Sequence, residues 1–596
     1  MNTVIIAEKP SQARAYAEAF NVKNKSKTYI ELEPCSTFKN GALITWAIGH
    51  LITLKKPHET KEQVNTWDLS NLPYLPETYE LKIAKDKTQH FISVKNLLKQ
   101  ADLIINGCDI DREGSNIFYL ILEYARITNK NIKRLWINSL EEDEVRQGFN
   151  NLRDNSKDYL MFQEAKARMV SDYLIGMNLS PLYTLKMQEY GEVSATFSIG
   201  RVQTPTLFMI YQRQNEIDHF ESEPFHEIHG QFYKNEFEYK GKMKLLEKEK
   251  SSVLDKLKSI ENVKQGTIKS VRKEKKKQLA PMLHSLSTLQ TTANKKWKYS
   301  PNKTLDAIQK LYDKKMVTYP RTDTQYITEN EFNYLKENIN RYLSLYDLNH
   351  DMDYPNPRKR FVDGSQVQEH YALVLTKSVN KSQIEGLDSI QTNIFKEIYN
   401  TTLAMFLSDY EYETTEVITS IKECDFYSQG KIDVKLGWKE LFSEDPIKEE
   451  DNKLPNLQEG DVVEAKAKLY EGMTQPPKLY TEGQLINLMK SCGKLIDDEE
   501  DNAILKEVEG IGTEATRASI IDTLKKREYI NVVKNKVNIT TKGQLLCKAV
   551  AGTLLSSPEM TAKWEHFLNK IGKNEGSQSM FLDTIEKFVL SLIENA

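Results

Sequence analysis

The sequence predicts a multidomain protein that joins an α/β part to helical and β-rich parts. With 596 residues the chain is long enough for about four domains. In its first part, short apolar runs alternate with helical patterns, which is typical of a parallel sheet. Residues 221–280 and 405–475 are rich in alternating Tyr, Phe, Val and Thr, as β-strands are. These two blocks bracket a helical block at 281–400, so we expect one discontinuous β-rich domain.

Composition narrows the class of protein. The chain is 39% hydrophobic and 28% charged, which is ordinary for a globular protein. No apolar run approaches the roughly 20 residues that span a bilayer, and the N-terminus, MNTVIIAEKP, lacks the features of a secretory signal. The five cysteines lie far apart and form no CxxC pair, which argues against zinc and against a disulfide framework. We expect a cytoplasmic protein without membrane contact.

The charge is close to balanced but is unevenly distributed. A net charge of −3 and a pI near 6.4 argue mildly against nucleic-acid binding. Two segments are nevertheless basic, namely the run 272–277 and the lysines around Trp297. Each is either a solvated face or a contact for a polyanion. If nucleic acid binds, a narrow basic lining must lie inside an otherwise acidic surface.

The first part of the chain places polar residues after two apolar strands. A strand at 4–7 precedes a helix at 11–20, and a second strand at 103–105 precedes a helical pattern at 117–124. In open α/β sheets, functional groups collect at the carboxyl ends of the strands. Glu8 and Asp109 are both predicted to lie there.

Later segments are mainly helical. Residues 158–178 carry one apolar stripe, with Arg168 and Asp172 one turn apart on the surface. Ser300 and Pro301 predict a helix start, and that helix leads toward Tyr319. Residues 478–596 are predicted to be helical with a β-like stretch at 532–539, and the acidic run 497–501 is predicted to form a surface loop.

The octapeptide 316–323, MVTYPRTD, is the strongest chemical signal. Tyr319 is a possible nucleophile, and Pro320 biases it toward an extended or turn conformation. Arg321 offers a planar fork of donors that suits a phosphate. This arrangement suits covalent phosphoryl transfer. The same residues are also consistent with a structural tyrosine that is half-buried in a turn.

An acidic cluster is the second signal. Asp109, Asp111 and Glu113 alternate on one short loop, and carboxylates this close need a cation or a basic group beside them. Their hard oxygen atoms suit Mg²⁺, which neutralises phosphate charge. Glu8 and Lys9 add a possible general acid and a cation for phosphate. The chain has no GxxxxGK[ST] loop, so no ATP site is predicted.

Taken together in order, these motifs closely resemble those of the type IA DNA topoisomerases, most nearly topoisomerase III. The resemblance runs from Ile5 to about residue 570. The segments IAEKPS (6–11) and DIDREG (109–114) resemble a toprim domain, flanked by GHL (49–51) and LWINSL (135–140). SIGRVQTPTL (198–207), VTYPRTD (317–323) and EHYALVLT (369–376) resemble the strand-binding, tyrosine and histidine segments. TQPPKLYTEGQL (474–485) and GIGTEATRASII (510–521) resemble the last core motifs.

The resemblance implies a torus in which a β-rich arch holds a gate. The implied segments are a toprim domain (1–150), a helical strand-binding domain in two parts (151–220 and 478–596), an arch in two parts (221–280 and 403–477), and a helical domain with the tyrosine (281–402). It also implies single-strand cleavage through a 5′-phosphotyrosine, strand passage and religation without ATP. Decatenation and relaxation of negatively supercoiled DNA are the expected outcomes.

The resemblance also implies residue roles. Tyr319, Glu8, Lys9 and Arg321 are the implied catalytic residues, and Glu8, Asp109, Asp111 and Glu113 are the implied ligands of one or two Mg²⁺ ions. The implied DNA contacts are Trp67, Arg168, Asp172, Tyr173, Ser198, Ile199, Gly200, Arg201, Val202, Gln203, Arg321 and His370. The expected partners are single-stranded DNA, DNA with single-stranded regions, and a helicase, and the expected state is a monomer.

Two departures and several alternatives stay open. Thr401 and Thr402 stand where relatives often carry two arginines, which puts a DNA contact there in doubt. The chain has no C-terminal zinc ribbons, which favours a minimal topoisomerase III over topoisomerase I. The alternatives are a topoisomerase I-type relaxase, a toprim nuclease or primase that leaves Tyr319 idle, and a non-enzymatic single-strand clamp.

Overall fold

The structure of the chain is a computed structural model. It describes residues 2–189, 191, 195–244, 250–350, 352–367, 370–443, 453–492 and 510–595. Glu369 of the histidine segment and the predicted acidic loop at 497–501 lie outside these ranges.

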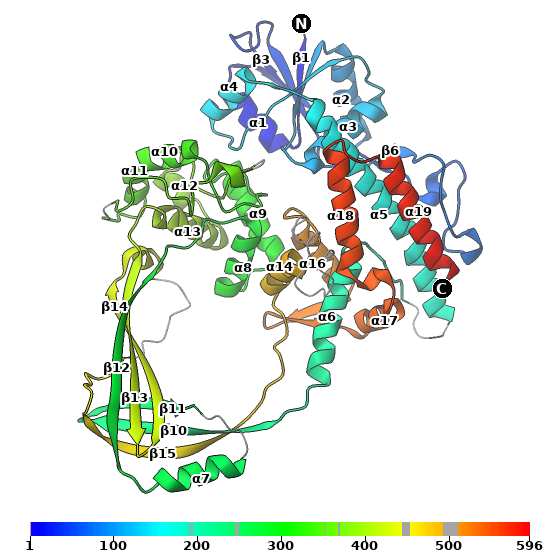
Figure 1. Cartoon of the computed structure of the whole chain (residues 1–596). Coiled ribbons are helices and arrows are strands. Elements are labelled where there is room, and N and C mark those ends of the chain that lie inside the picture. The colour runs from blue at the N-terminus through cyan, green and yellow to red at the C-terminus, as the bar shows by residue number, and fades with distance from the viewer. Residues whose placement is uncertain are drawn as a thin grey trace.

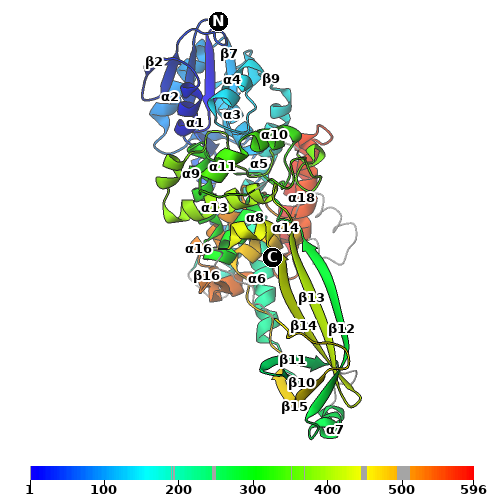
Figure 2. The ribbon, with the colours of Figure 1, turned by 90° about the vertical axis from the view of Figure 1, so that its left-hand side faces the viewer.

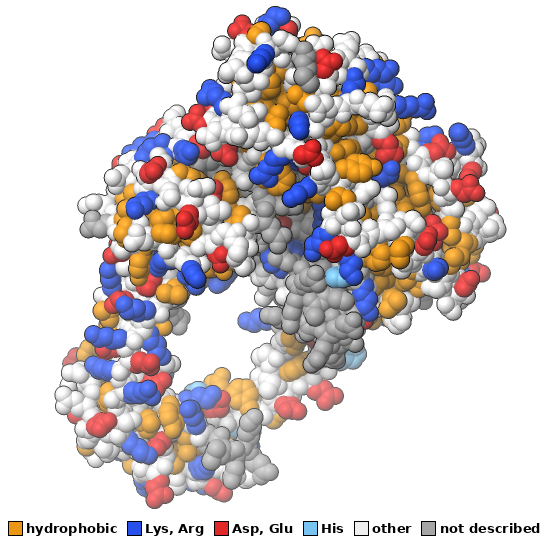
Figure 3. All heavy atoms as spheres, turned by 45° about the horizontal axis from the view of Figure 1, so that its top comes forward, with side chains coloured by type: hydrophobic (Ala, Val, Ile, Leu, Met, Phe, Trp, Pro, Cys, Tyr) orange, Lys and Arg blue, Asp and Glu red, His pale blue; other side chains and the backbone are white. Residues whose placement is uncertain are grey.

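The molecule is a ring with an α/β domain on top of it. Figure 1 shows helices above a wide opening and a β-barrel below it, joined by long strands on one side and by thin connections on the other. The space-filling view in Figure 3 shows that the opening passes through the molecule. Seen from the side in Figure 2, the barrel extends well away from the helices.

The N-terminal domain is built on a seven-stranded sheet in the order β2-β3-β4-β1-β7-β8-β9. Strand β1 pairs in parallel with β4 and β7, and β7 pairs in parallel with β8. The remaining pairs are antiparallel. The strands are β1 (Thr3–Ala7), β2 (Val22–Lys25), β3 (Tyr29–Leu32), β4 (Ala42–Trp46), β7 (Leu103–Gly107), β8 (Asn131–Arg134) and β9 (Arg153–Asp154), with a separate hairpin of β5 (Ile52–Leu54) and β6 (Leu81–Ile83).

Alternating side chains of β1 supply two cores. Ile5 and Ala7 pack in one core with α1 (Pro10–Glu18) and α4 (Glu142–Asn150). Val4 and Ile6 pack in the other with α2 (Thr88–Gln100) and α3 (Arg112–Ala125). Because successive side chains of a strand point to opposite faces, an apolar strand covered on both faces is what a parallel sheet requires.

Two long helices and the C-terminal part form the second unit. Helix α5 (Ser156–Glu189) packs with α3, α18 and α19. Its core includes buried residues of α6 (Gln203–Asp218) and of the C-terminal elements. These elements are α14 (Glu482–Ser491), α16 (Arg517–Lys526), the hairpin β16 (Ile530–Val533) and β17 (Lys536–Ile539), α17 (Thr541–Val550), α18 (Pro558–Gly572) and α19 (Gln578–Glu594).

The barrel closes from strands of both β-rich blocks. Its order is β10-β11-β14-β13-β12-β15, and β15 pairs with β10 and β12. The strands are β10 (Pro224–Lys234), β11 (Phe237–Met243), β12 (Gln265–Gln278), β13 (Tyr410–Ile421), β14 (Cys424–Lys435) and β15 (Val462–Met473). Inward residues such as Ile228, Phe232 and Phe426 form its core.

The helical block between the two β-rich blocks carries the tyrosine. It contains α8 (Leu286–Trp297), α9 (Pro301–Asp313), α10 (Glu329–Glu337), α11 (Ile339–Ser344), α12 (Lys381–Glu385) and α13 (Ser389–Ala404). Ser300 caps α9 by accepting from the Lys303 N–H, with Pro301 at the first helical position. The segment after α9 lies beside residues 371–376, where Val317 bridges to Leu375.

The predicted fold class is confirmed, with local differences. Helix α5 continues to Glu189, beyond the predicted end at 178. Helix α7 (Lys250–Ile260) lies within the first predicted β-rich block, where Val253 and Ile260 cover the barrel core. The residue boundaries of the six predicted segments stay predictions. Among the helices described, none is both long and apolar enough to span a membrane.

Candidate active site

Tyr319 lies where the tyrosine-bearing helices meet the N-terminal sheet. Its side chain is buried, and its hydroxyl donates to Asp109 Oδ2 and Asp111 Oδ2, each at 3.3 Å. Its backbone N–H donates to the Asn138 carbonyl at 3.2 Å. The nucleophile candidate and the acidic cluster, some 210 residues apart in sequence, therefore share one site.

The two aspartates are placed by the end of β7 and the start of α3. Asp111 caps α3, and its Oδ1 accepts from the Gly114 N–H at 2.7 Å. A Cβ at Gly114 would collide with the Asp109 carbonyl oxygen, so the tight turn depends on glycine. The buried guanidinium of Arg134 donates to the carbonyls of Cys108 and Asp109, both at 2.7 Å.

Glu8 follows β1, the strand next to β7, and lies beside Asp109. Its Oε2 accepts from the Asp109 N–H at 3.3 Å. Gln12 joins the two acids, because its Oε1 accepts from the Glu8 N–H and its Nε2 donates to Asp109 Oδ1, both at 2.8 Å. The prediction that Glu8 and Asp109 lie together at the carboxyl ends of the strands agrees with this placement.

Burial sets the protonation of the site. It raises the pKa of Glu8 well above its ordinary value, and the charges of Asp109 and Asp111 raise it further. Burial and the same two aspartates raise the pKa of the Tyr319 phenol. Burial acts in the same direction on Asp111, but Arg321, the Gly114 N–H and His370 outweigh it and hold the pKa of Asp111 below its usual range. The pKa shifts of Glu8 and Asp111 therefore run in opposite directions, so Glu8 keeps its proton to a higher pH than Asp111 does.

Arg321 and His370 flank the tyrosine. Arg321 Nη1 lies 3.4 Å from Asp111 Oδ2. The His370 ring stacks on Tyr319 with centroids 4.3 Å apart, and its Nδ1 shares a hydrogen bond of 2.9 Å with Asn138 Oδ1. Burial lowers the pKa of His370 to about 4, so the ring is neutral at physiological pH.

Two predicted residues point elsewhere in this structure. Lys9 Nζ lies 3.8 Å from Asp313 and 5.9 Å from the ring centre of Tyr312, whose ring in turn contacts Tyr319 with centroids 5.6 Å apart. Glu113 is nearly half exposed and pairs with His50 of the GHL segment. Neither side chain joins the Tyr319 cluster.

The donor atoms fit Mg²⁺ through two carboxylates. Within the described ranges, no three His, Cys, Asp or Glu side chains are arranged to hold a metal ion together. Asp109 Oδ2 and Asp111 Oδ2 nevertheless face the same hydroxyl. Mg²⁺ commonly binds one or two protein carboxylates, and water and substrate phosphate complete its coordination shell. Asp109 and Asp111 are therefore enough protein ligands for one ion.

Comparisons with known proteins agree with this geometry. The profile of a family described as DNA topoisomerase matches residues 156–583, and that of the toprim domain matches residues 3–140. The chain belongs to the type IA DNA topoisomerases. Toprim domains generally bind Mg²⁺, and enzymes of this family bind single-stranded DNA and act by single-strand passage.

Proteins named DNA topoisomerase 1 and DNA topoisomerase 3 both align with nearly the whole of this chain. DNA topoisomerase 1 of Alkalihalophilus pseudofirmus is 33% identical and aligns over 99% of this chain and 84% of its own. DNA topoisomerase 3 of Vibrio cholerae is 30% identical over 100% of this chain and 94% of its own. The solved structure of full-length topoisomerase I from Thermotoga maritima has the same fold, with a TM-score of 0.73, 21% identity, and coverage of 99% and 90% of the two chains.

Arg201, one of the implied DNA contacts of this topoisomerase, is occupied within the protein. Its buried guanidinium lies 3.0 Å from Asp172 and 2.7 Å from Glu565 on α18. Asp172 also lies 4.0 Å from Arg168. These pairs tie α5 to the segment before α6 and to α18, so Arg201 stabilises the unit in this structure, and its contact with DNA stays a prediction.

The segment 198–203 forms a tight turn. Tyr529 hydroxyl accepts from the Ser198 N–H at 2.6 Å, Ser180 Oγ accepts from the Ile199 N–H at 2.9 Å, and Thr204 Oγ1 accepts from the Gly200 N–H at 3.1 Å. Gln203 Nε2 donates to the Ser198 carbonyl at 3.0 Å, while Ile199 and Val202 are buried. Their roles in DNA binding stay predictions.

Trp67 and Tyr173 differ in exposure. Trp67 is 47% exposed, which suits a stacking surface for a base. Tyr173 forms T-shaped, edge-to-face contacts with Tyr74 and Tyr79, with centroids 6.5 and 6.3 Å away. At the departure in α13, Thr401 and Thr402 are buried, and their hydroxyls donate to helix carbonyls of Glu397 and Ile398.

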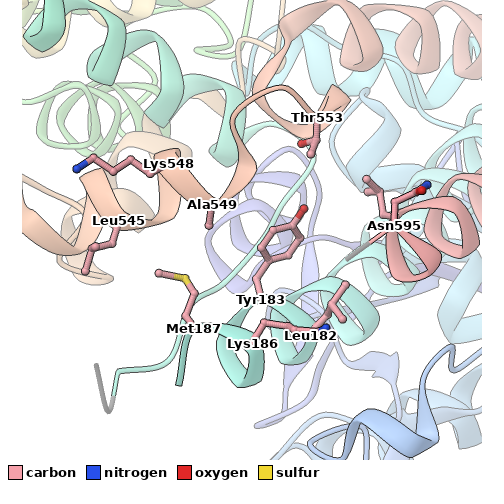
Figure 4. Close-up of a pocket in the computed structure, with 10 residues that line it drawn as sticks. Leu182, Tyr183, Lys186, Met187, Leu545, Lys548, Ala549, Thr553 and Asn595 are labelled. Carbon is pink, nitrogen blue, oxygen red and sulfur yellow. The ribbon is translucent and has the colours of Figure 1, made fainter. Parts of the chain in front are cut away.

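Gln12, Asn138 and Arg134 support the site without having been predicted. Gln12 and Asn138 lie within or next to segments that carry the family resemblance, IAEKPS and LWINSL. Their position in those segments was the available signal. A pocket of about 660 Å³, lined by α5, α17 and the end of α19, holds none of the predicted site residues (Figure 4).

Proposed function

We propose that Tyr319 cleaves a single DNA strand and remains joined to its 5′ end. The observation that supports this is the hydroxyl of Tyr319 at 3.3 Å from two aspartates at the carboxyl end of β7. In the reaction, a bond forms between the phenol oxygen and phosphorus, and the bond from phosphorus to the 3′ oxygen breaks. The phosphotyrosine retains the energy of the broken phosphodiester, so religation needs no ATP.

Each neighbouring residue has a specific task in this proposal. Asp109 or Asp111 accepts the phenol proton, because both already accept its hydrogen bond. Glu8, whose pKa is raised by burial, donates a proton to the departing 3′ oxygen and takes it back during religation. Arg321 and His370 hold the scissile phosphate region. Asp109 and Asp111 would hold Mg²⁺, which supplies positive charge beside the phosphate when it is bound.

The phenol needs an incoming strand to become reactive. In this structure burial and two aspartates oppose ionisation of Tyr319. When a DNA phosphate binds Arg321, the ion pair between Arg321 and Asp111 breaks, and the guanidinium contacts the phosphate instead. Lys9, close to Tyr312, supplies a second cation near the same phosphate. Ligand roles for Glu8 and Glu113 are part of the proposal only if those side chains turn toward the aspartates.

Label transfer tests the covalent step. A single-stranded oligonucleotide labelled at its 3′ end should leave its label on the protein after denaturation, whereas a 5′-end label should appear on a shortened free oligonucleotide. Tyr319→Phe should abolish the adduct. Tyr312→Phe, which alters the tyrosine whose ring centre lies 5.6 Å away, should retain it. An adduct that survives in Tyr319→Phe, or a 5′ label on the protein, would refute the proposal.

The physiological role proposed is decatenation of DNA with single-stranded regions, with relaxation of negative supercoils as a second activity. We propose that the enzyme acts as a cytoplasmic monomer together with a helicase that exposes single strands. Rates on gapped catenanes and on matched supercoiled plasmids decide between this role and a topoisomerase I-type relaxase. Faster relaxation than decatenation would favour the relaxase.

A further inference from the structure

The turn between α8 and α9 lies at the edge of the central opening. The start of α8 is next to the active site, because the Leu286 N–H donates to the Thr322 carbonyl at 3.0 Å. Its other end approaches the connection that rises from the barrel, where Asn294 Oδ1 accepts from the Gly483 N–H at 3.1 Å. In Figure 1 the lower end of α8 borders the opening. We call residues 295–303 the α8–α9 corner.

The corner combines aromatic rings with lysines. Trp297 and Tyr299 stack with centroids 5.9 Å apart and planes at 26°, and Lys303 Nζ lies 4.9 Å from the Tyr299 ring centre. The rings are held in place, since Asn393 Nδ2 donates to the Tyr299 hydroxyl at 2.8 Å. Lys295, Lys298 and Lys303 are exposed. Such a mixture of rings and cations is how proteins bind single strands without regard to sequence.

Among the residues that the structure describes, the three exposed lysines of the corner form no ion pair, unlike three of the lysines in the other basic segment. On β12, Lys273, Lys276 and Lys277 pair with Glu413, Glu274 and Glu411 respectively. At the corner, Lys296 is mostly buried and pairs with Glu397. Within the described part of the chain, Lys295, Lys298 and Lys303 form no ion pair with a carboxylate, so their charge is available to a phosphate.

We propose that the α8–α9 corner binds a second single DNA strand, the one that occupies the opening while the first strand is held at Tyr319. The proposal rests on the proposed strand-passage function and adds a site to it. Lys295, Lys298 and Lys303 contact phosphates, and Trp297 and Tyr299 offer their edges and free surface to bases. The α8–α9 corner belongs to the same helical block as Tyr319. A second strand bound there is therefore held close to the cleavage site through which it has passed.

Photocrosslinking tests the site without relying on catalysis. The full-length protein would be saturated with an oligonucleotide that contains iododeoxyuridine, irradiated and digested, and the modified peptides identified by mass spectrometry. We expect crosslinks at Trp297 or Tyr299 in addition to those near the first strand. At saturation, crosslinks confined to other regions such as Trp67 would overturn the proposal.

Strand passage tests the use of the site. The double variant Lys295→Ala/Lys298→Ala should form the covalent adduct at the wild-type level but decatenate about ten-fold more slowly at physiological salt, because each lost phosphate contact weakens single-strand binding. Lys295→Arg/Lys298→Arg should restore the rate. Lys336→Ala/Lys381→Ala is the matched control, since α10 and α12 lie away from the opening in Figure 1.

The outcomes separate the two proposals. If wild-type protein forms no adduct, the covalent mechanism fails, while the crosslinks still decide whether the corner binds DNA. If the adduct forms and the double variant decatenates as fast as wild type and the control, the corner has no role in passage and the proposal is wrong. Equal melting temperatures for the variants ensure that a slow rate reflects DNA binding rather than misfolding.

Discussion

At the scale of single residues, the site is governed by burial. Tyr319, Asp109 and His370 are each less than 5% exposed, so their side chains contact protein atoms rather than water. Low dielectric strengthens their interactions and shifts the pKa of Tyr319 upward and that of His370 downward. A closed site of this kind favours the protonated phenol and the neutral imidazole.

His370 gives a pH prediction. Its pKa is about 4 in the folded protein, against 6.5 for an ordinary histidine. As the pH falls below 6.5, the unfolded chain takes up a proton that the folded protein refuses, so stability present above that value is lost toward pH 4. From about pH 7.5 to about pH 5, wild type should lose about 2 kcal/mol more than His370→Gln. Thermal unfolding of both proteins at both values checks this, and parallel losses would contradict it.

The chemical types at the site were predictable, but the supporting hydrogen bonds were not. A tyrosine beside an arginine and alternating acids after an apolar strand carry local signals, and Tyr319, Glu8, Asp109 and Asp111 meet in one place. Asn138 acts through His370, 232 residues away, and Gln12 acts through Asp109, 97 residues away. No sequence pattern indicates which distant residue the amide side chain of Asn138 or Gln12 will contact. Lys9 and Glu113 lie in the expected segments but point to other partners.

At the scale of elements, the start of α3 fixes the distance between the acids and the sheet. Gly114→Ala should displace the Asp109 carbonyl and the cap at Asp111, and lower the rate of adduct formation by about ten-fold or more. Gly176→Ala is the control: it lies on α5 with open space around it, and alanine there should leave the rate unchanged and add about 0.5–1 kcal/mol of stability. Single-turnover cleavage of an oligonucleotide measures both. Equal rates would show that the turn tolerates a side chain.

A second element-scale prediction concerns the ion pairs that tie α5 to α18. Arg201→Ala leaves buried Glu565 without its closest partner and should cost about 3 kcal/mol or more. Arg168→Ala removes the 4.0 Å pair with Asp172 and a favourable charge near Glu565, and should cost less than Arg201→Ala does. Denaturant unfolding compares them, and a small loss in Arg201→Ala would favour a role in DNA binding alone.

Element types followed from sequence patterns, whereas some lengths and partners did not. Alternation in 221–280 predicted strands, yet α7 lies among them, because an amphipathic helix covers the barrel as well as a strand would. The apolar stripe of α5 continues past 178 at Leu179, Leu182, Tyr183 and Met187, which pack with the C-terminal elements. Pro181, a residue that usually ends a helix, lies inside it, and tertiary packing outweighs that local signal. Closure of the barrel depends on pairing between blocks more than 100 residues apart, which local patterns do not encode.

At the scale of the whole molecule, contacts between the N-terminal domain and the tyrosine-bearing helices close the ring over Tyr319. Besides the site itself, the described polar contacts include Lys9 at 3.8 Å from Asp313, Lys315 paired with Glu18 at 2.7 Å, and the Ser378 N–H donating to Glu141 at 2.7 Å. Lys315→Glu should repel Glu18 and raise the open population by up to about five-fold, because an exposed pair is worth about 1 kcal/mol or less. Glu18→Lys in the same protein should restore it. Single-molecule fluorescence between labels on α4 and α10 reports opening, and an unchanged distribution would show that this pair does not hold the gate.

The barrel has a consequence for the behaviour of the protein in a crowded solution. A flat sheet at the end of a long arm would present an outer strand whose free N–H and C=O groups invite pairing with another chain. Here the sheet closes on itself, so among the six described strands none is outermost. The part of the molecule that projects farthest from the helices is thereby protected from strand-to-strand aggregation between neighbouring copies.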